Sequence, residues 1–395
     1  MSYNFLNFMN FIDFFNSLNT FHFATATVLL TAFTVQLFYY LYYYRKILSR
    51  GKKIRKGKIT FSDKKPPVSV VICAKNESEN LQKFLPSVLT QNYPNYQVIV
   101  VNDGSNDESE EILAIFSQEY PHLYHTYLPQ TAKFISTKKM ALTVGIKAAK
   151  HDIVLLTDAD CEPAGKDWIT NIVRNFDEKT EVLLSYGAYF KEKGVLGKLI
   201  SYDAFTIALQ YMGFALAGKP YMGVGRNLAY RKQLFFDNKG FASHLNLQSG
   251  DDDLFFKEVA TKRNTQVEIS PESITYSVPK QSFKSWRIQK SRHFTTAPYY
   301  KASTRLRIGG ETASRFLFYV AIIALAATQN LWIVGFAGGI YLLRVLVQLL
   351  VINRTARKMN EQRFYFSALL FDIILPIINL YIFIFCRRKS RMKWE

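Results

Sequence analysis

Long uncharged stretches near both ends of the chain constrain its fold more than any other feature, because a single globular core has no room for them. Residues 14–44 contain no Asp, Glu, Lys or Arg. Within this stretch, residues 23–44 are long enough to cross a bilayer as a helix that rises about 1.5 Å per residue. We therefore expect a transmembrane anchor at 23–44, preceded by an extracytoplasmic or interfacial segment at 1–22.

The basic residues after the anchor indicate its orientation. Lys and Arg crowd residues 45–58, at the start of a linker that we place at 45–65. The positive-inside rule puts such a segment in the cytoplasm. A cleaved signal peptide would need a basic region before the apolar run and a small-residue cleavage site after it, and neither is present. The sequence thus predicts an integral membrane protein with the domain after the linker in the cytoplasm, as at a bacterial inner membrane.

The C-terminal third predicts further membrane segments at 308–386. Residues 316–352 are interrupted only by Arg344. This run is too long for one crossing and slightly short for two, so we expect a tight hairpin around 328–330.

The last apolar run, 364–386, contains Asp372 and Pro376 and precedes a basic tail at 387–395. A full crossing would place this tail outside, against the positive-inside rule. A broken or re-entrant segment at Asp372 and Pro376 would keep the tail inside. The sequence leaves both arrangements open.

Charge and cysteine content narrow the class of protein. A net charge of +19 is compatible with nucleic acid, but the basic residues crowd beside the apolar runs, where such residues set topology and contact anionic lipids. We therefore expect membrane lipids as partners and no nucleic acid. The 3 cysteines lie far apart and lack the spacing of a zinc site or a disulfide framework.

Residues 66–307 have the composition of a soluble α/β domain. Apolar runs at 68–73, 98–101 and 153–156 predict buried strands, and residues 79–89 and 109–118 predict helices. Strands that alternate with helices form a mostly parallel, doubly wound sheet, which binds ligands beyond the carboxyl ends of its strands. Polar clusters follow all three strands: Lys75-Asn76-Glu77, Asn102-Asp103-Gly104-Ser105 and Asp158-Ala159-Asp160.

Asp158 and Asp160 form the sharpest chemical signal, because they directly follow a buried strand. Two carboxylates two positions apart on an irregular strand end can converge on one divalent cation, and a sugar diphosphate needs such a cation to offset its charge. A solvated turn is the plain alternative. Mg²⁺ and Mn²⁺ both accept carboxylate and phosphate oxygens, so the sequence does not separate them.

Asp103 follows the second strand and precedes a glycine, which suits a tight turn that presents its carboxylate to a base or a ribose. An Asx turn or a helix cap is the alternative, although Ser105 and Asp107 are better placed to cap the next helix.

Three consecutive acids, Asp251, Asp252 and Asp253, precede an apolar helical pattern. Their mutual repulsion is relieved by a metal, a cationic partner or a proton-transfer role, so one of them can be a general base. The alternative is an acidic first helical turn, which the helix dipole favours.

Residues 286–293 predict a basic helix that places Gln289 and Arg292 on one face, where a diphosphate and an acceptor can bind. Its other cations, Lys284, Arg287 and Lys290, are expected to touch anionic lipid. A separate apolar stretch, 200–217, is open to two interpretations: an interfacial helix that guides a lipid acceptor, or a buried core helix.

Taken in this order, the motifs resemble those of membrane-bound family-2 glycosyltransferases with the GT-A fold, the branch that includes cellulose, hyaluronan and ceramide glucosyltransferase-like enzymes. The resemblance covers roughly residues 66–292. It implies that Glu77 and Asp103 bind the uridine of a UDP-sugar donor and that Lys138 contacts the donor near its phosphates. It further implies that Asp158 and Asp160 contact the diphosphate and its Mg²⁺ or Mn²⁺.

The resemblance also assigns the acceptor side and the catalytic acid. Gly223, Gly225 and Asn227 lie in a loop of the acceptor side, Gly223-Val-Gly-Arg-Asn227. The catalytic base corresponds to Asp251, with Gly250 where a glutamate is usual, and Asp252 is the second choice. In Gln289-Lys-Ser-Arg292-His293, Gln289 and Arg292 correspond to donor-binding residues, and His293 replaces the tryptophan expected to stack on an acceptor sugar.

The activity implied by the resemblance is metal-dependent, inverting transfer of a sugar from a nucleotide-sugar to a lipid-linked or other glycan acceptor near the membrane. A processive polysaccharide synthase is the first alternative, against which the missing tryptophan and the small number of expected spans argue. A catalytically inactive, nucleotide-sugar-binding membrane scaffold is the second. Donor sugar, acceptor identity and oligomeric state are not encoded in these motifs.

Overall fold

The computed structural model describes residues 19–129 and 137–386, so the basic tail at 387–395 and most of the segment 1–22 lie outside the described residues. The chain divides into two compact units. The first combines residues 1–42 with 302–352, and the second combines residues 43–301 with 353–395.

The first unit is a bundle of apolar helices. It contains α2 (Thr20–Phe38), α12 (Ala302–Ala326) and most of α13 (Leu331–Lys358), and α12 ends just before the predicted hairpin position at 328–330. Its core joins Leu29, Phe33, Phe318, Leu325 and Ile333. Many other apolar side chains of these helices remain exposed, as expected for helices that face lipid.

A buried polar cluster ties the three helices of this unit together. The fully buried Arg344 of α13 donates to Gln36 Oε1 of α2 at 3.0 Å and to Gln348 Oε1 at 3.1 Å. Gln36 Nε2 in turn donates to Ser314 Oγ of α12 at 2.7 Å. The arginine that interrupts the apolar run in the sequence is therefore an interhelical contact inside the bundle.

Helical structure continues past the predicted end of the anchor. A π-helical segment, Tyr39–Tyr44, follows α2 and leads into α3 (Arg45–Arg55), which occupies the start of the basic linker. Five helices of the described chain are long and apolar enough to cross a membrane: the continuous segment Thr20–Arg55, α8 (Val195–Leu216), α12, α13 and Tyr365–Phe385. This content fits association with a membrane.

The second unit is built on a seven-stranded sheet in the order β3-β2-β1-β4-β8-β6-β9. The strands are β1 (Val68–Ala74), β2 (Tyr96–Asn102), β3 (Leu123–Tyr127), β4 (Ile153–Asp158), β6 (Val182–Leu184), β8 (Leu228–Arg231) and β9 (Thr265–Val267). Neighbouring strands are parallel except at β8, which runs antiparallel to both β4 and β6. The prediction of a mostly parallel sheet is confirmed.

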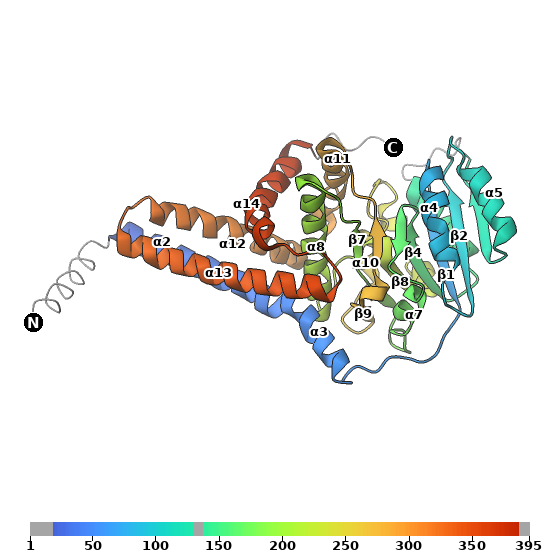
Figure 1. Cartoon of the computed structure of the whole chain (residues 1–395), viewed down its shortest axis with the longest axis horizontal. Coiled ribbons are helices and arrows are strands. Elements are labelled where there is room, and N and C mark those ends of the chain that lie inside the picture. The colour runs from blue at the N-terminus through green and yellow to red at the C-terminus, as the bar shows by residue number, and fades with distance from the viewer. Residues whose placement is uncertain (1–18, 130–136, 387–395) are drawn as a thin grey trace, which may run out of the picture. The chain divides into compact units, whose positions relative to one another are not determined.

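Helices cover both faces of this sheet (Figure 1). Leu81 of α4 (Ser78–Leu89), Leu113 of α5 (Ser109–Glu119) and Trp168 of α7 (Trp168–Val173) share one core with buried strand residues. On the opposite face, α6 (Thr137–Ala148) lies so close that a Cβ on Gly145 would come within 2.5 Å of Val71 Cγ1. Because the strands are buried on both faces, they read as continuous apolar runs in the sequence.

A second, three-stranded sheet was not predicted. It has the order β5-β10-β7 and consists of β5 (Cys161–Pro163), β10 (Thr275–Ser277) and β7 (Gly187–Tyr189). Each strand is too short to produce a periodic pattern. The remaining elements of this unit are the helices α9 (Lys232–Asp237), α10 (Asp253–Val259), α11 (Phe283–His293) and α14 (Tyr365–Tyr381), the 3₁₀ turns Gly225–Asn227, Ala242–His244, Pro271–Ser273 and Ala297–Tyr299, and a π-helical segment, Ile382–Cys386.

The stretch predicted as either interfacial or core is α8, and 72% of its most apolar window is buried. The core interpretation is therefore correct for most of this helix. Lys290 of α11, which we expected to contact lipid, is buried as well and places Nζ 2.5 Å from both carboxylate oxygens of Asp203 in α8. The lipid prediction was wrong for Lys290, because periodicity alone does not reveal a buried partner on a distant helix.

The last apolar run forms α14, and Pro376 lies inside it without ending the helix. Of the two arrangements that the sequence left open, the structure shows a helix without a break at this proline. Phe371 of α14 packs against Tyr202 of α8, with ring centroids 5.6 Å apart.

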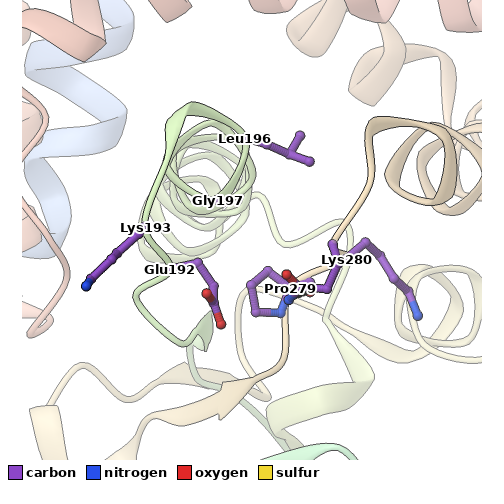
Figure 2. A pocket seen from close by; sticks show the side chains of 7 residues that line it. Glu192, Lys193, Leu196, Gly197, Pro279 and Lys280 are labelled. Carbon is purple, nitrogen blue, oxygen red and sulfur yellow. Dashed lines mark hydrogen bonds between the residues drawn. The ribbon is translucent and has the colours of Figure 1, made fainter.

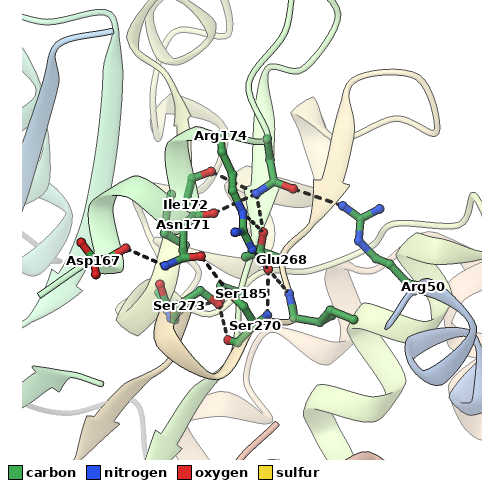
Figure 3. Close-up of polar contacts among 12 residues, drawn as sticks. Arg50, Asp167, Asn171, Ile172, Arg174, Ser185, Glu268, Ser270 and Ser273 are labelled. Atoms are coloured by element: carbon green, nitrogen blue, oxygen red, sulfur yellow. Dashed lines mark hydrogen bonds and ion pairs between the residues drawn. The ribbon is translucent and has the colours of Figure 1, made fainter. Parts of the chain in front are cut away.

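A buried polar network joins α3 to the sheet domain (Figure 3). Arg50 of α3 donates to Asn175 Oδ1 at 3.1 Å, and Asn175 donates to Glu268 Oε2 at 2.6 Å. Glu268 is fully buried and forms an ion pair with Arg174 at 3.2 Å. The basic linker is thus anchored to the second unit through one of its arginines.

Candidate active site

Strand register brings the polar strand ends together. Cys73, near the end of β1, lies opposite Asp158 at the end of β4, and Ala74 lies opposite Asn102 at the end of β2. Parallel strands that end at one edge place their following residues at that edge. The three polar clusters identified in the sequence therefore share one edge of the sheet.

Lys138 is the central cation of this edge. Its Nζ lies 3.0 Å from Asp158 Oδ1 and 3.6 Å from Asp251 Oδ2. Asp158 comes from β4, Lys138 from the first turn of α6 and Asp251 from the segment just before α10. One ammonium group therefore links the predicted metal motif to the predicted catalytic acid.

The charge of Asp158 is stabilised by its surroundings. Burial by itself raises the pKa of this carboxyl, but Lys138, Arg226 and Arg292 outweigh that effect and lower the pKa below its usual value. Asp158 is therefore held as a carboxylate.

Asp160 has a different environment. Its Oδ2 accepts from Ser277 Oγ at 2.9 Å, and its Oδ1 lies 3.4 Å from Cys161 Sγ. Burial and the neighbouring charge of Asp158 raise its pKa, so a nearby positive charge would favour ionisation.

The donor atoms of Asp158, Asp160 and Cys161 all lie within 4.8 Å of one another. Two convergent carboxylates match the oxygen preference of Mg²⁺ and Mn²⁺. The residues present thus fit a divalent cation.

The three consecutive acids have three different sets of partners. Asp253 is buried and accepts from Thr296 Oγ1 at 2.6 Å and from the Tyr300 hydroxyl at 2.5 Å. These contacts fix the start of α10 to the segment that follows α11. Asp253 is therefore a structural residue.

Asp252 caps α10 and also contacts the acceptor-side loop. Its Oδ1 accepts from the Asp253 backbone N–H at 2.7 Å, and its Oδ2 accepts from the Gly225 N–H at 2.8 Å. Burial, followed by the charges of Asp251 and Asp253, raises the pKa of Asp252 to about 7. Both carboxylate oxygens of Asp252 already accept hydrogen bonds from the backbone. Asp251 instead faces Lys138. These two observations favour Asp251 as the base.

The loop Gly223–Asn227 is held on several sides. A Cβ on Gly223 would come within 2.9 Å of the Leu228 side chain and 3.1 Å of the Leu184 side chain, so a larger residue there would displace these leucine ends. Asn227 is buried; its Oδ1 accepts from Trp168 Nε1 at 3.2 Å, and its Nδ2 donates to the carbonyls of Tyr186 and Ser273. Since these contacts occupy the Asn227 amide, an acceptor would meet the loop through its other residues.

Arg226 of this loop is a functional candidate that we did not single out in the sequence. Its guanidinium carbon lies 4.2 Å from the ring centroid of Tyr189 in β7. Tyr189 also shares a hydrogen bond with Gln289 of α11. The signal for Arg226 was available, because a basic residue between Gly225 and Asn227 lies inside a motif already assigned to the site.

Helix α11 brings the last predicted residues to the same region. Arg292 is close enough to Asp158 to lower the pKa of that carboxyl, and Gln289 contacts Tyr189. His293 follows Arg292 at the end of the helix and is exposed. The helix thus directs polar and cationic side chains toward the carboxylates of β4.

The residues predicted to bind the base lie beyond β1 and β2. Asp103 is buried, and its backbone N–H donates to the Ala74 carbonyl at 2.7 Å. Glu77 Oε2 accepts from Asn80 Nδ2 at 2.5 Å; burial raises the pKa of Glu77, and the charges of Asp160 and Asp158 raise it further.

The capping role expected of Asp107 is present. This carboxylate accepts from the Ser78 N–H at 2.9 Å and from the Ser109 N–H at 3.2 Å, so it serves the first turns of both α4 and α5.

A small hollow of about 60 Å³ lies between the start of α8 and the segment that leads into α11 (Figure 2). It is lined by Glu192, Lys193, Leu196, Gly197, Pro279, Lys280 and Gln281. Pockets for drug-sized ligands are typically about 300–1,000 Å³, so this hollow is too small for a nucleotide-sugar. The carboxylate and cation cluster at the sheet edge is the better candidate site.

Comparison with known proteins identifies the family of the sheet domain. The profile described as glycosyl transferase family 2 matches residues 69–237, which contain β1, β2, β4 and the Asp158–Asp160 motif. This segment belongs to glycosyltransferase family 2. The resemblance on which the sequence interpretation depends is confirmed for the family.

Two curated relatives illustrate how far the family likeness extends. Poly-beta-1,6-N-acetyl-D-glucosamine synthase of Staphylococcus epidermidis is 36% identical over 24% of this chain and 21% of that enzyme. Probable glycosyltransferase YdaM of Bacillus subtilis is 24% identical over 83% of this chain and 86% of that protein. The match with the higher identity thus covers 93 residues of this chain and about a fifth of the length of the synthase.

The fold is also shared with a solved structure. A mannosyltransferase of Pyrobaculum calidifontis, determined with GDP-Man and Mn²⁺, superposes with a TM-score of 0.55 at 18% identity, over 90% of this chain and 99% of that one. At this identity the likeness concerns the fold alone, and it supports the predicted GT-A arrangement with terminal apolar helices.

Proposed function

We propose that this protein is an inverting glycosyltransferase that moves a sugar from a nucleotide-sugar, most simply a UDP-sugar, onto a hydroxyl of a lipid-linked or other membrane-proximal acceptor. The observation that carries the proposal is the position of Lys138 Nζ, 3.0 Å from Asp158 and 3.6 Å from Asp251. It joins the carboxylate expected at the donor diphosphate to the carboxylate expected at the acceptor. Both partners of a displacement reaction would therefore meet at this point.

Asp251 is the proposed general base. It accepts the proton of the acceptor hydroxyl while the oxygen attacks the anomeric carbon. The new carbon–oxygen bond forms as the bond to the diphosphate breaks, and the nucleoside diphosphate leaves with the electron pair. A single in-line displacement inverts the anomeric carbon without a covalent intermediate.

The proposed roles of the cations follow from the negative charge that the leaving nucleoside diphosphate gains during the reaction. Lys138 and Arg292, whose charges act on Asp158, would stabilise the negative charge that grows on the leaving diphosphate. Mg²⁺ or Mn²⁺ held by Asp158 and Asp160 would offset further charge on the donor when bound. Glu77 and Asp103, beyond β1 and β2, would hold the nucleoside, and Gln289 would support the site through Tyr189.

The membrane placement of the acceptor rests on the apolar helices. The described chain contains five helices of spanning length, and the basic segment 45–58 favours a cytoplasmic catalytic domain. A lipid-linked acceptor would stay in the same plane as the site.

A processive synthase is the second candidate, favoured by the likeness to poly-beta-1,6-N-acetyl-D-glucosamine synthase. The exposed His293 in place of a stacking tryptophan supports transfer of one sugar. Chain length of the product separates the two candidates.

The test is release of nucleoside diphosphate by full-length protein purified in detergent, supplied with UDP- and GDP-sugars, membrane lipids, and Mg²⁺ or Mn²⁺. The comparison includes Asp251→Asn and Asp158→Ala, with Asp63→Asn in the exposed linker as the matched control. Metal-dependent release that both site variants lose and the control keeps is the expected result. Binding of a donor without any turnover would instead support the scaffold alternative.

A further inference from the structure

Lys138, Arg226 and Arg292 are cations of the described chain that act on Asp158, and the proposed mechanism gives no role to Arg226. Its backbone is fixed between two strands that carry site residues. The Arg226 carbonyl accepts from Thr157 Oγ1 at 3.1 Å and from Thr275 Oγ1 at 2.9 Å. Thr157 immediately precedes Asp158 in β4, so the position of Arg226 is coupled to the carboxylate motif.

The side chain of Arg226 is held as firmly as its backbone. The guanidinium carbon lies 4.2 Å from the centre of the Tyr189 ring, and Nη1 donates to the Ala188 carbonyl at 3.4 Å. Gly187 makes room for it, because a Cβ at that position would come within 3.1 Å of Arg226 Cβ. An arginine stacked on an aromatic ring loses little freedom when it binds a ligand.

Electrostatics link this guanidinium to the donor end of the site. Arg226 is among the charges that lower the pKa of both Asp158 and Asp160 against the effect of burial. A sugar diphosphate that approaches these carboxylates brings further negative charge to the same place. The planar guanidinium carries several N–H groups in a geometry that suits phosphate oxygens.

We propose that Arg226 binds the diphosphate of the donor, as a second guanidinium beside Arg292. The proposal rests on the proposed function and extends it, since it assigns diphosphate recognition to the Gly223–Asn227 loop. The loop would then bridge donor and acceptor, because Gly225 contacts Asp252 of the acidic segment at 2.8 Å.

The experiment measures binding of UDP and of uridine, or of GDP and guanosine if guanine is the base, by calorimetry on full-length protein with Mn²⁺ present. The variants are Arg226→Met and Arg226→Gln. The matched control is Arg231→Met, which removes an arginine from the same part of the chain; Arg231 forms an ion pair with Asp152. The ratio of diphosphate to nucleoside affinity is compared within each sample, because it does not depend on the folded fraction.

We expect the Arg226 variants to bind the nucleoside as wild type does and to bind the nucleoside diphosphate at least about tenfold more weakly, the size expected for loss of a charge-assisted hydrogen bond. Arg231→Met should keep the wild-type ratio. An unchanged ratio in both Arg226 variants overturns this inference and leaves the proposed function intact. Failure of the wild-type protein to bind any nucleoside diphosphate overturns the proposed function itself.

Discussion

Glu268 offers a direct test of how the basic helix α3 is held to the sheet domain. Its carboxylate accepts from Arg174 twice, at 3.2 Å each, from Asn175 at 2.6 Å, and from the N–H groups of Ile269 and Ser270 at 2.8 and 2.7 Å. The side chain is fully buried. Replacing it by alanine leaves several donors and the Arg174 charge without their partner.

The expected loss is about 3–5 kcal/mol, the range for breaking a buried ion pair by removing one member. For a domain of this size about 1 kcal/mol corresponds to roughly 2–4 °C, so Glu268→Ala should lower the Tm by roughly 6–20 °C. The isosteric Glu268→Gln should fall between wild type and alanine, since it keeps an acceptor oxygen and loses the charge.

The pH dependence of the Tm tests independently whether the Glu268 carboxylate stabilises the fold. Burial disfavours the Glu268 carboxylate, but Arg174 and the hydrogen bonds outweigh burial and lower its pKa in the folded state below the ordinary 4.5. A group with a lowered folded pKa stabilises the fold above its unfolded pKa and loses that effect as pH falls. The Tm difference between wild type and Glu268→Gln should therefore shrink from pH 7 toward pH 4.

The assay is thermal unfolding of detergent-purified protein followed by intrinsic fluorescence. Glu272→Ala is the control, because Glu272 lies in the same segment and is exposed. If Glu268→Ala lowers the Tm no more than this control does, the proposed energetic role of the network is refuted.

Three further predictions concern other buried polar groups. Glu361 accepts from the Tyr186 hydroxyl at 2.8 Å, and burial raises its pKa to about 6. The stabilising contribution of Glu361 is therefore present at pH 4 and lost as the pH rises through 6. The Tm of wild type relative to Glu361→Gln should accordingly fall as the pH rises from 4 to above 6. Asn227→Ala should lower stability by about 1–3 kcal/mol, because it leaves the buried Trp168 N–H unpaired, and unfolding in urea measures this; no loss would contradict the assignment. Lys290→Met leaves Asp203 buried without its cation and should cost about 3–5 kcal/mol; adding Asp203→Asn should recover part of the Tm, and a second loss of equal size would show that the two residues act independently.

The sequence predicted the central part of the fold well, because buried parallel strands produce unmistakable apolar runs. Strands β1, β2 and β4 and helices α4 and α5 lie where the runs and helical patterns indicated. The short strands β5, β7 and β10 were missed, since three residues carry no periodicity. The buried pair of Lys290 and Asp203 was missed for another reason: it joins distant helices, and charge in a sequence is read by default as exposed.

The roles predicted for the site residues stay predictions, but the structure does bring residues from separate motifs together. Asp158, Lys138 and Asp251 converge as the order of motifs implied, although nothing in their spacing fixes the distances. The sequence did not predict separate roles for Asp251, Asp252 and Asp253. Three adjacent acids can be distinguished only by their contacts, which the structure supplies. Arg226 was overlooked because the resemblance drew attention to the glycines around it.

The central claim is that Asp251 is the base in an inverting transfer, and one comparison tests it most directly. Donor affinity, transfer rate and the anomeric configuration of the product are measured for wild type and Asp251→Asn under the same conditions. We predict an inverted product from wild type, and an Asp251→Asn protein that binds the donor normally but transfers at least about a hundredfold more slowly, as expected on loss of a general base. Transfer by Asp251→Asn at the wild-type rate, or retention of configuration in the wild-type product, would contradict the account.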